Sequence, residues 1–476
     1  MRQHQSGQTD RLVRDAGRLG VLVVLVFMTI VPGLGVLLTG RNLESFASLD
    51  VLEPSVAAAW VLRLASFGSV VALAFTIVTR GIGDLGVARR RSSLAMAGAF
   101  AFYFGTNVLA PGIMGHISGI PHTIYYVAML FVALFLLQEE VGDDIAKVAR
   151  NGLAVFLIAS LVSSVILPEY TVRAYREELR LPLVPFRFWG LSSGPNTIAP
   201  MALILIFLGI VKPFQRRWLQ VATMICAWSV VILAQSQTTW VATAVILTGL
   251  IVYRRDMQRT GAFSAKPSPA MLLAGAGLAA AGLVLFIALL ASGDPERVVQ
   301  TGGLTESSQD IVTGRSHIWA VALETFVQHP VFGYGLTAWE AEFRDAIGMS
   351  YAAHAHNQLM QALSVGGLTA AIGLVLYVSV MIWQSIRVAD ATGGLAPALV
   401  ALIVIRMISE VPLQLGSLLV SDTFMHVLTF AVLVSASPHS AMSLSAQYWG
   451  LRDRGAAAVD ALRGGGRGNS GRPVRG

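Results

Sequence analysis

The sequence is poor in cysteine and in charged residues, and each shortage excludes a class of protein. Its single cysteine, Cys226, excludes an intrachain disulfide and a cysteine-based metal cluster. Charged residues make up only 13% of the 476 residues, while hydrophobic residues make up 55% and the mean hydropathy is +0.66. Such a chain cannot fold as water-soluble globules, because it has too few polar side chains to cover them. The composition therefore predicts a polytopic membrane protein.

Long apolar runs predict an all-α polytopic membrane helical bundle of about 12 transmembrane helices. A crossing needs about 20 apolar residues, and its backbone must bond to itself inside the lipid, so each span is a helix. The first run, from Leu19, is too long for the core of a signal peptide and is interpreted as an uncleaved span. The expected spans are 19-40, 56-79, 93-110, 122-138, 151-167, 196-212, 218-235, 238-253, 270-292, 357-383, 395-412 and 425-437.

The net charge of +7 is concentrated in basic clusters that report the orientation of the spans. They precede span one and follow spans two, six, eight and twelve, so the positive-inside rule places them all in the cytoplasm. We therefore expect a multi-pass protein of the cell (cytoplasmic) membrane with both termini inside. Its parts are a cytoplasmic segment 1-18, a transmembrane domain 19-437 and a basic, glycine-rich tail 438-476, predicted to be disordered. No cluster interleaves with aromatics on a soluble segment, which excludes a nucleic-acid partner.

One outer loop, residues 293-356 between spans nine and ten, is much longer than the others and is expected to carry function. It is expected to be partly helical, because apolar residues recur there at spacings of three and four. Thr313 is expected to cap this helix and Pro330 to end it. We expect the helix to lie along the outer membrane surface. The spaced residues are Ile318, Trp319, Ala322, Leu323 and Phe326.

Six short motifs follow one another between residues 185 and 385. They are RFWGLSSGPN (Arg187 to Asn196), AQSQTTW (Ala234 to Trp240), TGRSHIW (Thr313 to Trp319), HPVFGYG (His329 to Gly335), HN (His356 and Asn357) and GGL (Gly366 to Leu368). In this order they resemble the O-antigen ligase and polymerase superfamily of bacterial membrane glycosyltransferases, which implies a GT-C-like fold. The resemblance also implies a metal-independent reaction without a cofactor. In that reaction a polyprenyl diphosphate-linked oligosaccharide donates its glycan to a glycan or lipid-glycan acceptor, on the outer side of the lipid bilayer.

Such a transfer needs a cation for the leaving diphosphate and a base for the acceptor hydroxyl. Arginine suits the diphosphate, because its planar fork makes paired bonds to phosphate oxygens. Arg315 matches the diphosphate-binding arginine of the family, and Arg187 is expected to supply a second cation. Histidine suits the base, because its unperturbed pKa lies near neutrality. His356 matches the histidine of the family motif and is expected to be the catalytic base.

Five further residues are expected to bind substrate or to support the base. His354 could replace or assist His356, Asn357 could orient the ring or bind a sugar hydroxyl, and Tyr334 could stack on a sugar. Asn196 and Gln237 complete the set. Gln237 stands where many members of the family have an arginine. This departure favours a polymerase over a ligase and makes Arg187 the better second cation.

Structural interpretations of the same residues stay open. Arg315 could pair with acidic residues of its own loop, the backbone could satisfy His356, and Arg187 could reach toward lipid headgroups. In span eleven, Arg406 and Glu410 are four residues apart and are expected to pair inside the bundle. His354 and His356 could bind a cation together with an acidic residue of the loop, but no metal site is expected.

Three functions are compatible with this pattern. The first is a polymerase of O-antigen, capsule or exopolysaccharide, and the second is a ligase that moves a finished glycan to a lipid, cell-wall or protein acceptor. These two share the proposed chemistry. The third is a transporter or flippase of lipid-linked sugars, which would need charged residues along the spans. The spans contain few charged residues, so transport is the weakest of the three.

Overall fold

The computed structural model describes residues 2-43, 56-83, 91-137, 142-174, 181, 184-260, 311-349 and 352-436. Within these residues the chain is mostly helical, with only two short strands, and it has several helices long and apolar enough to cross a membrane. The predicted all-α membrane class is therefore confirmed. The predicted span 270-292, the first part of the long loop and the tail 438-476 lie outside the described residues.

The elements follow the chain from α1 to α17. They are α1 (Arg2–Thr39), α2 (Val56–Gly83), α3 (Arg91–Phe104), the π-helix η1 (Gly105–Leu109), α4 (Ala110–Met114), α5 (His122–Leu136), α6 (Gly142–Ile166), α7 (Pro168–Thr171), β1 (Val172–Ala174), β2 (Phe186–Phe188), α8 (Pro195–Val211), α9 (Arg217–Leu233), α10 (Gln237–Thr260), α13 (Ile311–Gln328), α14 (Ala341–Ala346), α15 (Gln358–Arg387), α16 (Leu395–Arg406) and α17 (Ser421–Ser435). The two strands pair antiparallel, with Arg173 opposite Arg187.

Among the described residues, 5 helices satisfy the length and hydropathy of a membrane span, and the other apolar helices are shorter. The long ones are Asp15–Thr39, Val56–Arg80, Ser93–Met114, Asp143–Ile166 and Gln358–Arg387. Every predicted span in the described part of the chain overlaps a helix, but the number of crossings stays a prediction. α6 begins at Gly142, ahead of the predicted span 151-167, and so includes polar residues before that span. One boundary was wrong: α16 ends at Arg406 rather than at residue 412, and the chain turns ahead of Pro412, which has no N–H for a helical bond.

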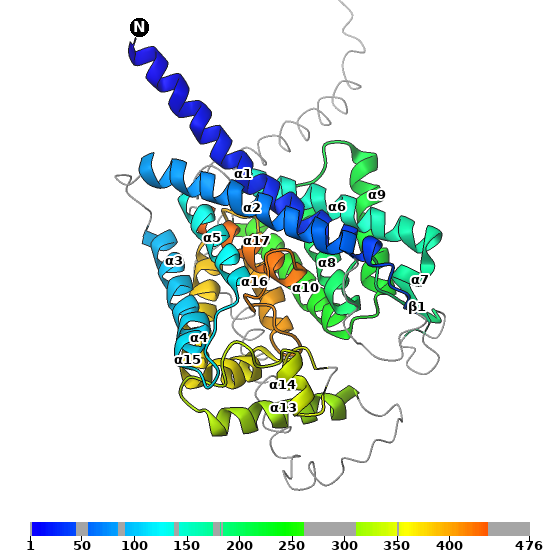
Figure 1. Cartoon of the computed structure of the whole chain (residues 1–476). Helices are drawn as coiled ribbons and strands as arrows, with labels where there is room; N and C mark the ends of the chain where they lie inside the picture. Colours follow the sequence, from blue (N-terminus) through cyan, green and yellow to red (C-terminus); the bar gives the residue numbers. More distant parts are fainter. Residues whose placement is uncertain are drawn as a thin grey trace, which may run out of the picture.

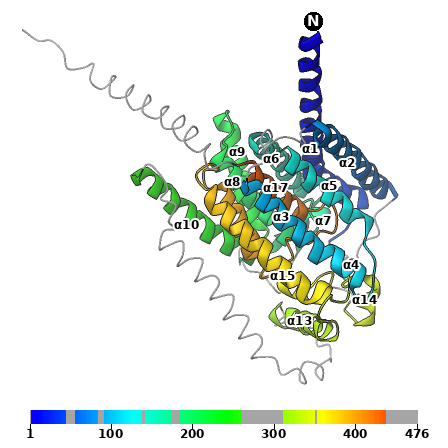
Figure 2. The ribbon, with the colours of Figure 1, turned by 90° about the vertical axis from the view of Figure 1, so that its left-hand side faces the viewer.

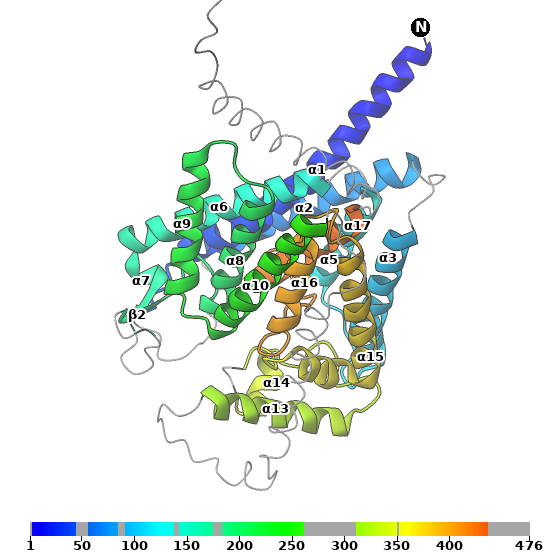
Figure 3. The same cartoon turned by 180° about the vertical axis from the view of Figure 1, so that it is seen from behind.

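α8 and α17 form the centre of the bundle and are buried along nearly their whole lengths. α1 and α2 cross one face of it, and α9 stands at the edge (Figure 1). α10 lies beside α16 on the opposite face (Figure 3). α2 keeps an exposed apolar side that includes Leu64, Phe67 and Val71, as expected of a helix that faces lipid.

α13 and α14 gather at one end of the molecule, beside the first turns of α15 (Figure 2). The predicted apolar face of the loop helix is confirmed. Ile318 and Ala322 are buried, and they pack with Trp339 and Phe343 of the same segment in a small second core. The predicted cap at Thr313 is wrong, because α13 already begins at Ile311.

Candidate active site

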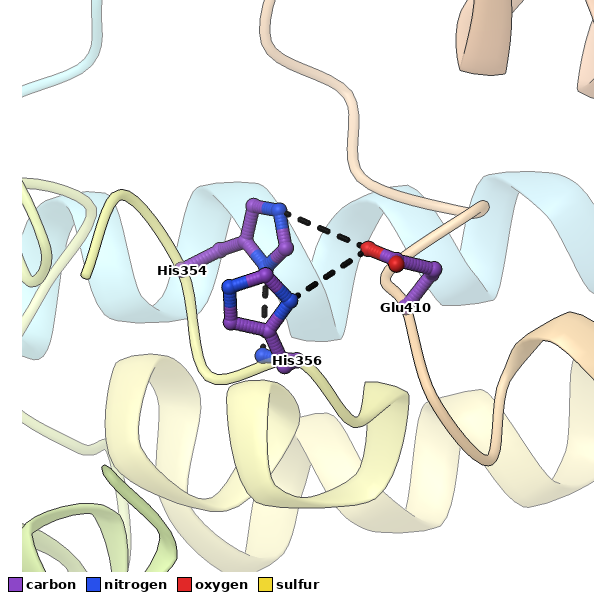
Figure 4. A group of neighbouring side chains, drawn as sticks. All are labelled: His354, His356 and Glu410. Atoms are coloured by element: carbon purple, nitrogen blue, oxygen red, sulfur yellow. Dashed lines mark hydrogen bonds and ion pairs between the residues drawn. The ribbon is translucent and has the colours of Figure 1, made fainter. Parts of the chain in front are cut away.

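Charged and polar side chains from three other segments meet around one carboxylate, that of Glu410. Glu410 lies in the turn between α16 and α17 and is 8% exposed. Asn196 reaches it from the first turn of α8, Arg315 from α13, and His354 and His356 from the segment before α15. The two imidazoles point toward the carboxylate from the opposite loop (Figure 4). Residues far apart in the chain therefore converge at the end of the bundle that carries α13.

The two oxygens of Glu410 have different partners. Oε1 accepts a hydrogen bond from Asn196 Nδ2 at 2.9 Å and lies 3.8 Å from Arg315 Nη2. Oε2 lies 3.4 Å from His356 Nδ1 and 3.8 Å from His354 Nε2. Burial disfavours the ionised form, but the contact with His356 and the positive charge of Arg406 outweigh it and lower the pKa of Glu410 to about 2. The carboxylate is therefore a fixed negative charge between a guanidinium and two imidazoles.

The two histidines differ in what their ring nitrogens can do. The backbone N–H of His356 donates to His354 Nδ1 at 3.1 Å, so that nitrogen is unprotonated and the proton of a neutral His354 sits on Nε2. Burial, with the nearby charge of His356, lowers the pKa of His354 to about 4. His356 itself adopts a left-handed backbone, with φ of 48°, a conformation that is uncommon outside glycine. Its Nδ1 faces Glu410, and Nε2 is the ring nitrogen on the other side of the imidazole.

A chain of polar contacts links the predicted second arginine to this centre. Arg187 donates through Nη2 to Asn196 Oδ1 at 3.2 Å and through Nε to the carbonyl of Ala234 at 3.1 Å. Asn196 in turn donates through Nδ2 to Glu410 Oε1, and the backbone carbonyl of Asn196 accepts a hydrogen bond from Arg406 Nη1. Pro195 begins α8 just before it, a position where proline fits a helix well. Arg187, through Asn196, and Arg315 are thus both linked to Glu410, and the paired grip of the two arginines on a diphosphate stays a prediction.

The three remaining predicted residues lie in or behind the same region. Gln237 is exposed and begins α10, and its neighbour Thr238 bonds to Ser409, next to Glu410, at 2.8 Å. Asn357 is the N-cap of α15, where Oδ1 accepts from the backbone N–H groups of Leu359 and Met360. The ring of Tyr334 packs against His116, His329 and Phe343. Their predicted contacts with substrate stay predictions.

Glu410 is the member of this candidate site that sequence reasoning missed. The expected pairing of Arg406 with Glu410 is wrong. Arg406 donates instead to Asp422 at 2.8 Å, and Glu410 lies beyond the end of α16 and faces the histidines. An ionisable residue inside an apolar region was the signal that could have found it, because such residues are seldom retained without a role.

The three residues His354, His356 and Glu410 also offer potential ligand atoms to a metal ion, all within 4.8 Å of one another. Two imidazoles and a carboxylate are a donor set that suits zinc. One contact weighs against that role. His354 Nδ1 already accepts the N–H of His356, so Nε2, which faces the carboxylate, carries the proton and is a donor rather than a ligand.

The fold and this site together define a polytopic membrane protein with a buried carboxylate, two imidazoles and two arginines at one end of its helices. Residues 221–378 match a family model described as O-antigen ligase. The match confirms the resemblance to the O-antigen ligase and polymerase superfamily, whose members are glycosyltransferase-like ligases and polymerases. It contains Gln237, Arg315 and the histidine segment, while Arg187, Asn196 and Glu410 lie outside it. No curated protein matches the chain.

Proposed function

We propose that this protein transfers a glycan from a polyprenyl diphosphate carrier to a sugar hydroxyl at the outer face of the cytoplasmic membrane, without a metal ion. The observation that carries the proposal is the convergence of Arg315 and His356 on Glu410, at 3.8 Å and 3.4 Å. A cation for a leaving diphosphate and a base for an attacking hydroxyl stand on either side of one carboxylate.

The base step follows from the orientation of His356. With Nδ1 protonated and held toward Glu410, Nε2 takes the proton of the acceptor hydroxyl. The hydroxyl oxygen then bonds to the anomeric carbon of the donor, while the bond from that carbon to the diphosphate breaks. The carboxylate stabilises the imidazolium as it forms and fixes the ring orientation, as the acid of a catalytic triad does.

The leaving step depends on the arginines. Negative charge grows on the diphosphate oxygens as the glycosidic bond breaks, and a guanidinium fork beside them stabilises that charge. Arg315, whose side chain is 29% exposed, is in place to meet a ligand. Arg187, oriented by Asn196, supplies the second cation that Gln237 does not. The lipid diphosphate departs with the electron pair.

Within this chemistry we favour a polymerase, because the Ser236-Gln237-Thr238 segment lacks the arginine of many ligases. The test is an assay of the purified protein in liposomes with a lipid-linked oligosaccharide as the only substrate. A ladder of lengthened products indicates a polymerase. Transfer that occurs only after a lipid, cell-wall or protein acceptor is added indicates a ligase. Movement of the lipid-linked sugar across the bilayer without any new glycosidic bond would instead indicate a transporter.

Variants of the site test the assigned roles in the same assay. We expect His356→Ala to lower turnover by about 10² to 10⁴. Glu410→Gln should lower it by at least about 100-fold, because a neutral amide does not stabilise the imidazolium. Arg315→Lys should lose at least about 10-fold, because an ammonium keeps the charge but not the fork.

The matched control is Glu342→Gln, which removes an exposed carboxylate from α14. It should retain the unsubstituted rate. Full activity of His356→Ala would remove the base assignment. Activity that is lost on chelation and restored by zinc would favour the metal interpretation of His354, His356 and Glu410 over the proposed one.

A further inference from the structure

Two buried glutamines, Gln358 and Gln361, lie three residues apart at the start of α15, directly after the histidine segment. They are 2% and 5% exposed. Neither is within the set of side chains that surrounds Glu410. We infer that they are positioning residues: Gln358 holds the turn that carries Glu410, Gln361 holds the loop that carries His356, and the first turn of α15 sets the distance between the two. This inference rests on the proposed function for its catalytic meaning.

Gln358 binds the Glu410 turn on both sides of the carboxylate. Its backbone N–H donates to the carbonyl of Met407 at 2.9 Å, and its Oε1 accepts the backbone N–H of Leu413 at 2.9 Å. Met407 precedes Glu410 in the chain and Leu413 follows it. Asn357 adds a bond from Nδ2 to the carbonyl of Ile408 at 3.1 Å. The whole turn is therefore attached to the beginning of one helix.

Gln361 binds the histidine loop in the same way. Its Oε1 accepts the backbone N–H of Ala355 at 2.8 Å. Ala355 is fully buried between the two histidines, and its carbonyl accepts the indole N–H of Trp319 at 2.9 Å. Ala355 is thus held through both of its backbone groups, one bond from α15 and one from α13. The positions of both imidazoles follow from that single anchored residue.

The two glutamines belong to the same helical turn, so the Glu410 turn and the histidine loop are fixed relative to each other. Residues three apart lie on the same side of a helix, so both amides can reach the loops that flank α15. A buried N–H that loses its acceptor finds no water to replace it, so the loop must move. Proton transfer is sensitive to such a movement of the loop, because a shift of about 1 Å in a catalytic group can lower the rate about 100-fold.

The test compares methionine variants, which keep the length of the side chain and remove the acceptor oxygen. We expect Gln358→Met and Gln361→Met each to lower kcat at least about 10-fold while the KM for the lipid-linked donor changes less than about 3-fold. Gln358→Glu and Gln361→Glu keep an acceptor oxygen and should restore most of the lost kcat.

The matched control is Gln384→Met in the same helix. Gln384 is also fully buried, and its Nε2 donates to the carbonyl of Leu433 at 3.2 Å, far along α15 from the site. It should retain kcat. If Gln358→Met and Gln361→Met lose no more kcat than Gln384→Met, the inference is wrong. Should the methionine variants not accumulate in the membrane, Gln358→Asn and Gln361→Asn, which retract the amide, are judged by the same criteria.

A distance measurement separates this inference from the proposed function. Spin labels are placed at Ala353→Cys and Gln414→Cys, both exposed positions in the two loops, in a Cys226→Ala background. We expect Gln358→Met and Gln361→Met to broaden the distance distribution between the labels, and Gln384→Met to leave it unchanged. An unchanged distribution in all three overturns the inference. If the unsubstituted protein does not turn over the donor, the proposed function fails, and the distances still decide whether the glutamines position the loops.

Discussion

At the scale of single residues, the site gives different hydrogen-bond partners to two histidines that are only two positions apart in the sequence. His354 has its Nδ1 occupied by the N–H of His356, and it turns a protonated Nε2 toward Glu410. His356 turns Nδ1 toward the same carboxylate and keeps Nε2 for a ligand. His354 therefore stays neutral and holds the backbone of His356, the proposed base.

This division predicts that acid weakens the fold through His354. Burial and the charge of His356 lower its pKa from 6.5 to about 4, so between these values the unfolded chain binds a proton that the folded chain excludes. Stability contributed by neutral His354 is complete above pH 6.5 and falls as the pH drops toward 4. At pH 5.5 the loss is on the order of 1 kcal/mol. Glu410, with its pKa lowered to about 2, adds its own loss only at more acid pH.

The measurement is the thermal midpoint of the detergent-purified protein at pH 7.5 and pH 5.5. His354→Asn keeps an acceptor for the N–H of His356 and cannot be protonated in this range. Its midpoint should fall less between the two pH values than that of the unsubstituted protein. Equal falls would show that His354 does not titrate with folding. The comparison at pH 7.5 controls for any effect of the substitution itself.

The role of Glu410 shows why part of the site could not be predicted from the sequence. His356 and Arg315 sit in short local motifs, so their chemistry was predicted from the family resemblance that those motifs carry. The role of Glu410 depends on where α16 ends. Had the helix continued to residue 412, Arg406 and Glu410 would share a face and pair. Because it ends at Arg406, the chain turns and carries Glu410 to the histidines, a contact between residues 54 positions apart in the chain (410 minus 356).

At the scale of elements, two motifs of the sequence turn out to be one structure. α15 has a non-helical residue at Gly367, with φ of 63°. The turn of the HPVFGYG motif hydrogen-bonds to the backbone of α15 on both sides of this kink. The N–H groups of Leu368 and Thr369 donate to Pro330 and Val331, instead of one turn back along α15. The carbonyls of Ser364 and Val365 accept instead from Tyr334 and Gly335. The turn therefore replaces the helical hydrogen bonds that the kink removes.

Glycine is required on both sides of this junction. A Cβ on Gly367 would lie 2.6 Å from the carbonyl carbon of Val331, and one on Gly333 would overlap the backbone of Val365. Both residues have positive φ, where a side chain is strained in any case. We expect Gly333→Ala and Gly367→Ala each to cost at least about 2 kcal/mol. The thermal midpoint and the yield of purified protein report the loss.

Gly98→Ala is the control, since a Cβ at Gly98 in α3 meets no atom within 4 Å. Alanine is the better helix former, so this variant should be neutral or more stable by up to about 1 kcal/mol. Equal stability of all three variants would contradict the junction. The sequence contains both partners of this contact as the HPVFGYG and GGL motifs. Only the fold shows that the two segments hydrogen-bond to each other, because a sequence pattern does not indicate which turn will bond to a kinked helix.

At the scale of the whole molecule, the helices that form the site run from it toward basic residues. α8 starts beside Asn196 and ends before Lys212, α10 starts at Gln237 and continues to Arg255, and α15 starts after His356 and ends at Arg387. With a rise of 1.5 Å per residue, the 17 residues of α8 separate the two ends by about 25 Å. The start of α1 also lies away from α13 (Figure 1). Within the described residues, the site and the basic residues at the far ends of these helices thus occupy opposite ends of the bundle.

This polarity predicts which side of the membrane the site faces, because basic clusters stay in the cytoplasm. In a Cys226→Ala background, Gln414→Cys at the site end should react with a membrane-impermeant maleimide added to intact cells or spheroplasts. Gln215→Cys, also at an exposed glutamine, among the basic residues that follow α8, should react only after permeabilisation. The two changes replace the same residue type and leave every charge in place, so they do not disturb the orientation they measure. The reverse pattern would put His356 and Arg315 in the cytoplasm and would contradict a reaction at the outer leaflet, since a carrier diphosphate held there could not reach them.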